Sequence, residues 1–318
     1  MRCTDLLLPR VPSCLLDCKQ SASPLKSWFQ EGDFEYDSAS SASQIPIIRN
    51  ATRSFEPTLA SEVDRFLCAM GESFSELSPS NFSSRSIGWV LIKAYYSSYF
   101  AAHALLRMTG CAITQIDGDL ANSIMKNLQL NGGTPHWQIS SSQYFVRYDE
   151  IQQLLLFQDK HGAKGGSHQF VWKKFGELLN SLISSCKQNG SVYQSELLLF
   201  ENISDILTAK SKTPDFSWLS SVRNSINYGF SHSVWFPFSG TQAKDSTALI
   251  NLLKCQSSQD CFATSPRNQS ELERFCIAAS FLVSFANASA NLIANRSKSK
   301  PFLSKSFIKL QKLVSMPS

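Results

Sequence analysis

One stretch of the chain, IGWVLIKAYYSSYFAAHALLRMTG at residues 87–110, constrains the fold more than any other. As a helix it is apolar on almost every side, with one internal charge at Lys93, and Gly110 marks its end. A helix that is apolar all round presents no face to water, so other elements must surround it. The segment therefore predicts the central helix of a bundle.

Other segments have the three-and-four spacing of apolar residues that is typical of amphipathic helices. No segment alternates convincingly between apolar and polar residues, as a half-buried strand would. The pattern predicts an all-α protein, a helical bundle without internal repeats. Besides 87–110, helices are expected at 58–74, 116–130, 149–159, 168–186, 195–210, 215–230, 245–255, 270–295 and 303–314.

Composition divides the chain into three parts. Residues 1–57 hold five prolines and the low-complexity run YDSASSASQ, which predicts an irregular N-terminal arm. The helical domain is expected at 58–296, with an insertion at about 111–160 that includes the loop NGGTPHW. Residues 297–318 form a basic C-terminal tail or helix, because no acid occurs between Arg296 and Lys312.

Charge and cysteine content favour a cytoplasmic protein with partners. Charged residues are only 17% of the chain, against about a quarter in typical soluble proteins, which favours a surface partly covered by partner subunits. The nine cysteines are scattered and form no CxxC pair, so we expect reduced thiols, no metal and no cofactor. The apolar segment 275–295 contains several Ser and Asn residues and predicts a buried helix rather than a membrane span.

Three segments, in this order, resemble the HEPN superfamily of small helical-bundle proteins. KAYYSSYFAAHALLRMTG (93–110) looks like the core helix of that family, and GSHQFVWKKFGELL (166–179) is similar to its Ser/Thr-His segment. RNSINYGF (223–230) looks like the arginine motif on its penultimate core helix. The resemblance covers about residues 60–295 and leaves out the N-terminal arm and the basic tail.

The resemblance implies a catalytic chemistry and also a departure from it. In active family members an arginine, followed after four to six residues by a histidine, forms a metal-independent ribonuclease site at a dimer seam. Such a site needs a base for the 2′-hydroxyl proton and fixed positive charge for the phosphorane. Here Arg223 and Asn224 match the motif, but Tyr228 stands where histidine is expected. Tyrosine, with an ordinary pKa of about 10, is a poor base at neutral pH.

His232 is the alternative proton-transfer residue, because Gly229 is expected to end the helix and let the chain bend His232 back toward Arg223. The candidate catalytic residues are therefore Arg223, Asn224, Tyr228 and His232. A structural interpretation stays open beside this one, in which Arg223 pairs with an acid and Tyr228 hydrogen-bonds at the helix end.

The remaining histidines and the basic tail have ordinary interpretations. His103 is expected to be a core histidine, His168 to cap or begin its helix, and His136 and His161 to lie in loops. The tail is expected to dock on the bundle through its apolar residues, with nucleic-acid contact as the second interpretation. The lysines that would then bind RNA are Lys298, Lys300, Lys305, Lys309 and Lys312.

By this resemblance, two functions are carried forward. The first is a non-catalytic or weakly catalytic HEPN-like subunit of a prokaryotic antiviral defence or toxin–antitoxin complex, which binds protein or RNA partners. The second is an active endoribonuclease that uses Arg223 with His232 or Tyr228. A homodimer is expected in either case, and a carrier or adaptor unrelated to nucleic acid is a third class. Burial of Arg223 in an intramolecular ion pair would remove the main support for catalysis.

Overall fold

Helix α5 (Gly88–Met108) is the central helix, as its apolar sequence predicts. It packs against α4 (Phe55–Ser75), α7 (Ser167–Gln188), α9 (Trp218–Asn227) and α12 (Glu271–Arg296). The computed structural model describes residues 3–18, 22–37, 46–51, 53–75, 77, 86–131, 135–160, 166–208, 216–229, 231–235, 243–254, 269–296 and 306–314. Most side chains of α5 are buried, because helices cover it on several sides.

The other helices of this layer also lie close to their predicted ranges. They are α8 (Gln194–Thr208), α10 (Ala243–Leu253) and α13 (Phe307–Val314), with short 3₁₀ turns η4 (Gly190–Tyr193) and η5 (Ser231–Ser233). The helix predicted within 116–130 is α6 (Gly118–Leu130), which begins after the capping carboxylate of Asp117. The amphipathic pattern thus predicted most of the helices correctly.

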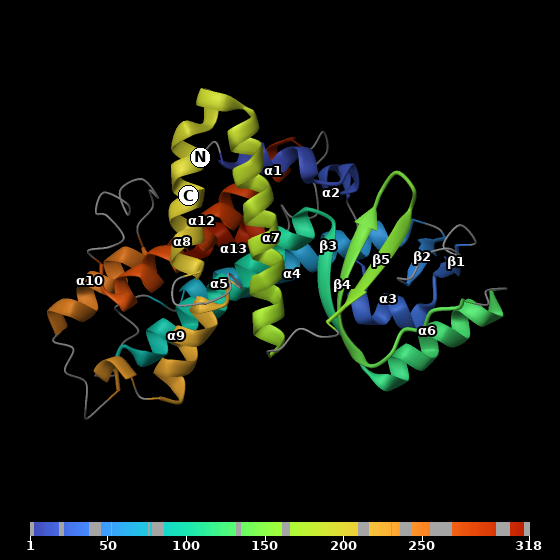
Figure 1. The fold of residues 1–318 in the computed structure, drawn as a ribbon, viewed down its shortest axis with the longest axis horizontal. Coiled ribbons are helices and arrows are strands. Elements are labelled where there is room, and N and C mark those ends of the chain that lie inside the picture. Colours follow the sequence, from blue (N-terminus) through green and yellow to red (C-terminus); the bar gives the residue numbers. More distant parts are fainter. Residues whose placement is uncertain are drawn as a thin grey trace.

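The all-α prediction is wrong, because a five-stranded sheet lies beside the helices (Figure 1). Every neighbouring pair of strands is antiparallel, in the order β1-β2-β5-β4-β3. Helices α3 (Leu25–Glu31) and α6 pack together at this end of the molecule, far from α10. The strands are β1 (Phe34–Tyr36), β2 (Ile47–Asn50), β3 (Cys111–Ile116), β4 (Ser142–Asp149) and β5 (Leu154–Asp159).

The run DEIQQLLLFQD explains part of the error. It was predicted to be a helix, but its first half is a turn and LLLFQD is strand β5. Because β5 lies between β2 and β4, its apolar residues form a continuous run rather than an alternating one. Such a run has no period that separates a buried strand from a buried helix.

The N-terminal arm is not irregular over its described residues. It forms α1 (Cys3–Leu7), η1 (Leu8–Arg10), α2 (Ser13–Asp17) and α3, and it supplies β1 and β2 to the sheet. Arg10 donates to Ser181 O at 3.1 Å and to Ser185 Oγ at 2.8 Å, which joins the arm to α7. The Ser-rich residues 38–45 lie outside the described part of the chain. The sheet therefore combines the arm with the predicted insertion at 111–160.

Two helices test the interpretation of the C-terminal region. Helix α12 is long and apolar enough to cross a membrane by length and composition, but 83% of its most apolar window is buried inside the protein. Helix α13 docks on α4: Phe307 is buried, and its N–H donates to Asp64 Oδ1 at 3.1 Å. Both segments thus lie as core and docked helices, as the sequence predicts.

Candidate active site

Arg223 and Asn224 lie next to each other on α9, and the arginine points inward. Only 9% of Arg223 is exposed, whereas Asn224 is exposed. The guanidinium Nη1 donates to Asn224 Oδ1 at 2.9 Å, and its Nε is buried without a hydrogen-bond partner. Among the residues that the structure describes, no carboxylate pairs with Arg223. The ion pair that would have supported a purely structural role is therefore not found there.

His168, the second residue of α7, faces this guanidinium. Its Nε2 lies 3.5 Å from Arg223 Nη2, and its Nδ1 lies 2.8 Å from Tyr95 Oη. Burial and the positive charge of Arg223 lower the pKa of His168. The same Tyr95 oxygen accepts from Trp172 Nε1 at 3.1 Å. A neutral imidazole is thus fixed beside the arginine.

Aromatic rings from α5 surround the pair. The Arg223 guanidinium lies 5.2 Å from the Tyr95 ring centroid and 5.6 Å from that of Tyr96, distances typical of cation–π contacts. Tyr99 stacks on His168 with its centroid 4.4 Å away. Tyr95 is buried, and burial raises the pKa of its hydroxyl, while Tyr96 and Tyr99 are only half-buried. The tyrosine rings of the central helix therefore pack against both the Arg223 guanidinium and the His168 imidazole.

The structure does not join Tyr228 or His232 to Arg223. Tyr228 ends α9, donates its backbone N–H to Asn224 O at 2.9 Å, and is 72% exposed. His232 has a positive φ of 67° in η5, and its Nε2 lies 3.4 Å from Glu271 Oε2. Within the described residues, neither side chain contacts the guanidinium. Of the four predicted catalytic residues, Arg223 and Asn224 therefore lie together, whereas Tyr228 and His232 lie away from the guanidinium.

The sequence did place His168 at the start of its helix, but it did not connect it with Arg223. The two residues are 55 positions apart, and only the packing of α7 and α9 against α5 brings them together. The signal present in the sequence was the Ser/Thr-His segment quoted for the family resemblance. It identified the histidine without giving its partner.

Of the other predicted residues, His103 is a buried core histidine, and Arg107 Nη1 lies 2.9 Å from its Nδ1. His136 is exposed, and His161 lies outside the described residues. For the predicted RNA contacts, the docked helix α13 carries two exposed lysines, and the other three lie outside the described residues. The exposed pair is Lys309 and Lys312, and the others are Lys298, Lys300 and Lys305.

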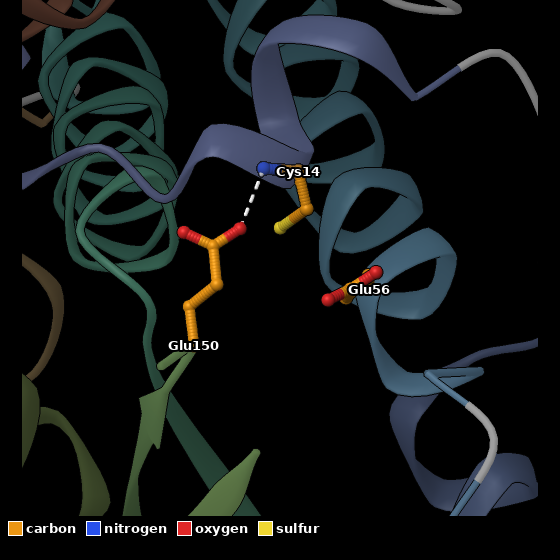
Figure 2. A group of neighbouring side chains, drawn as sticks. All are labelled: Cys14, Glu56 and Glu150. Carbon is orange, nitrogen blue, oxygen red and sulfur yellow. Dashed lines mark hydrogen bonds between the residues drawn. The ribbon is translucent and has the colours of Figure 1, made fainter. Parts of the chain in front are cut away.

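A second group of polar side chains joins the arm to the sheet end of the molecule. Cys14 on α2, Glu56 on α4 and Glu150 after β4 have ligand-type atoms within 4.8 Å of one another (Figure 2). However, Glu150 Oε1 accepts from Cys14 N at 2.9 Å, and both its oxygens accept from Ser13. Burial raises the pKa of the Cys14 thiol, which keeps it protonated. These contacts make Glu150 a cap for α2 and explain the group without a metal.

No known family model matches the chain, and no curated protein or solved structure matches it either. Functional inference therefore rests on the geometry around Arg223 and on the resemblance of the three sequence segments.

Proposed function

We propose that the chain is a HEPN-like subunit that binds RNA at Arg223 and cleaves it weakly or not at all, within a prokaryotic defence or toxin–antitoxin complex. The single observation that carries the proposal is the nearly buried guanidinium with no carboxylate partner among the described residues. A buried cation without an anion is costly, so a bound anion is the partner that would stabilise it. RNA offers phosphates as such anions.

Weak catalysis follows from where the predicted proton-transfer groups lie. Tyr228 is exposed at the end of α9, and His232 lies beside Glu271. Neither is within hydrogen-bonding distance of Arg223, whereas a general base must lie within about 3 Å of the proton that it removes.

A second candidate function is a metal-independent endoribonuclease in which His168 is the base. The distance of 3.5 Å between His168 Nε2 and Arg223 Nη2 favours it, because a neutral imidazole and a fixed cation then lie side by side. The hydrogen bond to Tyr95 would orient the ring, as acidic groups orient the histidine of other hydrolases.

Binding and cleavage assays with labelled tRNA and single-stranded RNA in the presence of a chelator test both functions. The variants are Arg223→Ala, His168→Gln and, as a matched control on an exposed arginine outside the site, Arg147→Ala. The proposal expects RNA to be bound intact, with affinity lost in Arg223→Ala and kept in Arg147→Ala. Efficient cleavage that is lost in both site variants would replace it with the second function. No RNA binding at all would refute both and leave a protein partner as the ligand to seek.

A further inference from the structure

The Arg223 guanidinium has more donors than acceptors. A guanidinium carries five N–H donors, and the described residues offer it two acceptors, Asn224 Oδ1 at 2.9 Å and His168 Nε2 at 3.5 Å. The rings of Tyr95 and Tyr96 attract the charge but accept no strong hydrogen bond. Among the described residues, no negatively charged group with several oxygens completes this arrangement.

The hydrogen bonds around His168 fix where its lone pair points. Tyr95 Oη accepts from Trp172 Nε1 at 3.1 Å. A guanidinium can only donate, so Nε2 is the acceptor toward Arg223, and Nδ1–H is then the donor in the 2.8 Å contact with Tyr95 Oη. The Nε2 lone pair then faces Arg223. A protonated imidazole would turn this lone pair into a second N–H donor directed to the same place.

A ligand would approach the guanidinium along the edge near His168 and Asn224, because these neighbours are themselves accessible. Asn224 is exposed, and His168, Tyr96 and Tyr99 are half-buried, whereas Nε is fully covered. A planar guanidinium edge suits two oxygens of one phosphate, and an imidazolium and a carboxamide can donate to its other oxygens. The half-buried tyrosine rings beside the site offer faces on which a nucleobase can stack.

We propose that Arg223, His168 and Asn224 form a binding site for a phosphate group of a nucleotide, and that His168 takes up a proton when the phosphate binds. The proton comes from the solvent and stays on Nε2, which then donates to a phosphate oxygen. This inference rests on the proposed function and names the part of RNA that the site holds.

The surroundings of His168 agree with proton uptake on binding. The titratable groups that face it are Tyr95, Tyr96 and Tyr99 from α5 and Arg223 from α9. Among the described residues none of these is an acid, so only Arg223 opposes protonation by charge, together with burial. A phosphate against Arg223 would cancel that charge and raise the pKa of His168 again. Affinity should therefore be highest at acidic pH and fall as the pH rises through the pKa of the bound form.

The test measures proton uptake on binding of inorganic phosphate, adenosine monophosphate and a short single-stranded RNA. Calorimetry in two buffers of different ionisation enthalpy gives the number of protons taken up, and NMR of the imidazole C–H signals follows His168. The variants are His168→Gln and Arg223→Lys, with His136→Gln as a matched control on an exposed histidine. The phosphate's own titration, with a pKa of about 6, contributes equally with the wild type and with His168→Gln, so the uptake by His168 is read as the difference between them.

We expect phosphate to raise the pKa of His168 and to bind with net proton uptake, and we expect uptake to vanish in His168→Gln but not in His136→Gln. Arg223→Lys keeps the charge without the planar fork and should weaken binding by about tenfold or more. If the His168 signals titrate identically with and without saturating ligand, the inference is wrong, even if RNA binds elsewhere. Phosphate binding with proton uptake but no RNA binding would sustain the inference and refute the proposed function.

Tight binding by the short RNA alone would assign the site to internal phosphodiesters, and binding by the monophosphate alone would assign it to terminal phosphates. A variant that fails to fold does not stop the test, because the titration of His168 in the wild-type protein decides by itself. No ligand binding to the folded wild-type protein would overturn the inference directly.

Discussion

Replacement of Gly176 by alanine should disturb the candidate site without changing any residue in it. Gly176 lies on α7, the helix that carries His168, and a Cβ added there would lie 2.1 Å from Cδ2 of Phe216. Carbon atoms pack at about 3.5–4.0 Å, so the ring would have to move by about 1.5 Å. Phe216 is 5% exposed, has a positive φ of 56° and lies just before α9.

The expected magnitude combines two opposing effects. Overpacking of a filled core costs about 1–3 kcal/mol, and Gly→Ala inside a helix returns about 0.5–1 kcal/mol. The net loss in the free energy of unfolding should therefore lie between about 0 and 2.5 kcal/mol, centred near 1 kcal/mol, measured by chemical denaturation with an unchanged m-value. Displacement of Phe216 should also move Arg223 relative to His168 and weaken phosphate binding.

A double-mutant cycle separates this steric cause from others. In a Phe216→Ala background the added methyl group meets no ring, so Gly176→Ala should become neutral or stabilising by up to about 1 kcal/mol. Gly118→Ala is the matched control, since nothing lies within 4 Å of a Cβ at that helix position. An equal loss of stability from Gly176→Ala in both backgrounds would refute the reasoning.

Three further predictions concern charges that hold the fold together. Glu62→Ala should cost about 3–5 kcal/mol in the free energy of unfolding, because it leaves Arg107 buried without its carboxylate; Arg65→Ala, on an exposed neighbour, should have little effect. Burial raises the pKa of Asp64, so its ionisation opposes folding as the pH rises. Asp64→Asn should therefore remove this loss of stability, whereas Asp64→Ala should release α13 to cleavage by trypsin at its lysines. Burial raises the pKa of Glu150, but hydrogen bonds from α2 outweigh it and lower the pKa overall. Its stabilising contribution is present above about pH 4.5 and is lost as the pH falls, so Glu150→Gln should flatten the acid limb of the stability curve.

The helices were predictable because each has a length and a period that depend on local sequence. The segment 87–110 is apolar on almost every side and so required neighbours around it, and the structure packs other helices around α5. The sheet was not predictable in this way, since its strands come from the arm and the insertion and pair over long sequence distances. Strand β4 alternates between buried and less buried residues from Tyr144 to Tyr148. One of the less buried residues, Phe145, is apolar, so the sequence shows no clear alternation of apolar and polar residues there. Pairing, rather than local periodicity, determines these strands.

The candidate site was predictable only in part, for a similar reason. The motif RNSINYGFSH identified Arg223 and Asn224, and the residues around them in sequence were taken as their partners. Tertiary packing instead gives Arg223 a histidine from another helix, while the nearby His232 lies beside Glu271. After α9 the chain turns through His232 and Ser233, which have positive φ, so closeness in sequence does not imply contact.

A second buried arginine shows why it matters that, among the described residues, no carboxylate pairs with Arg223. Arg107, at the other end of α5, is also buried, lies 2.9 Å from a histidine nitrogen, and stacks over an aromatic ring at 4.1 Å. It differs in having a carboxylate, because Glu62 Oε2 accepts from its Nε at 3.1 Å. The same fold thus pairs one buried guanidinium with an acid and surrounds the other with a neutral imidazole, an amide and tyrosine rings. Since both cations face the same cost of burial, the difference supports the proposal that an anion from outside the chain completes the second one.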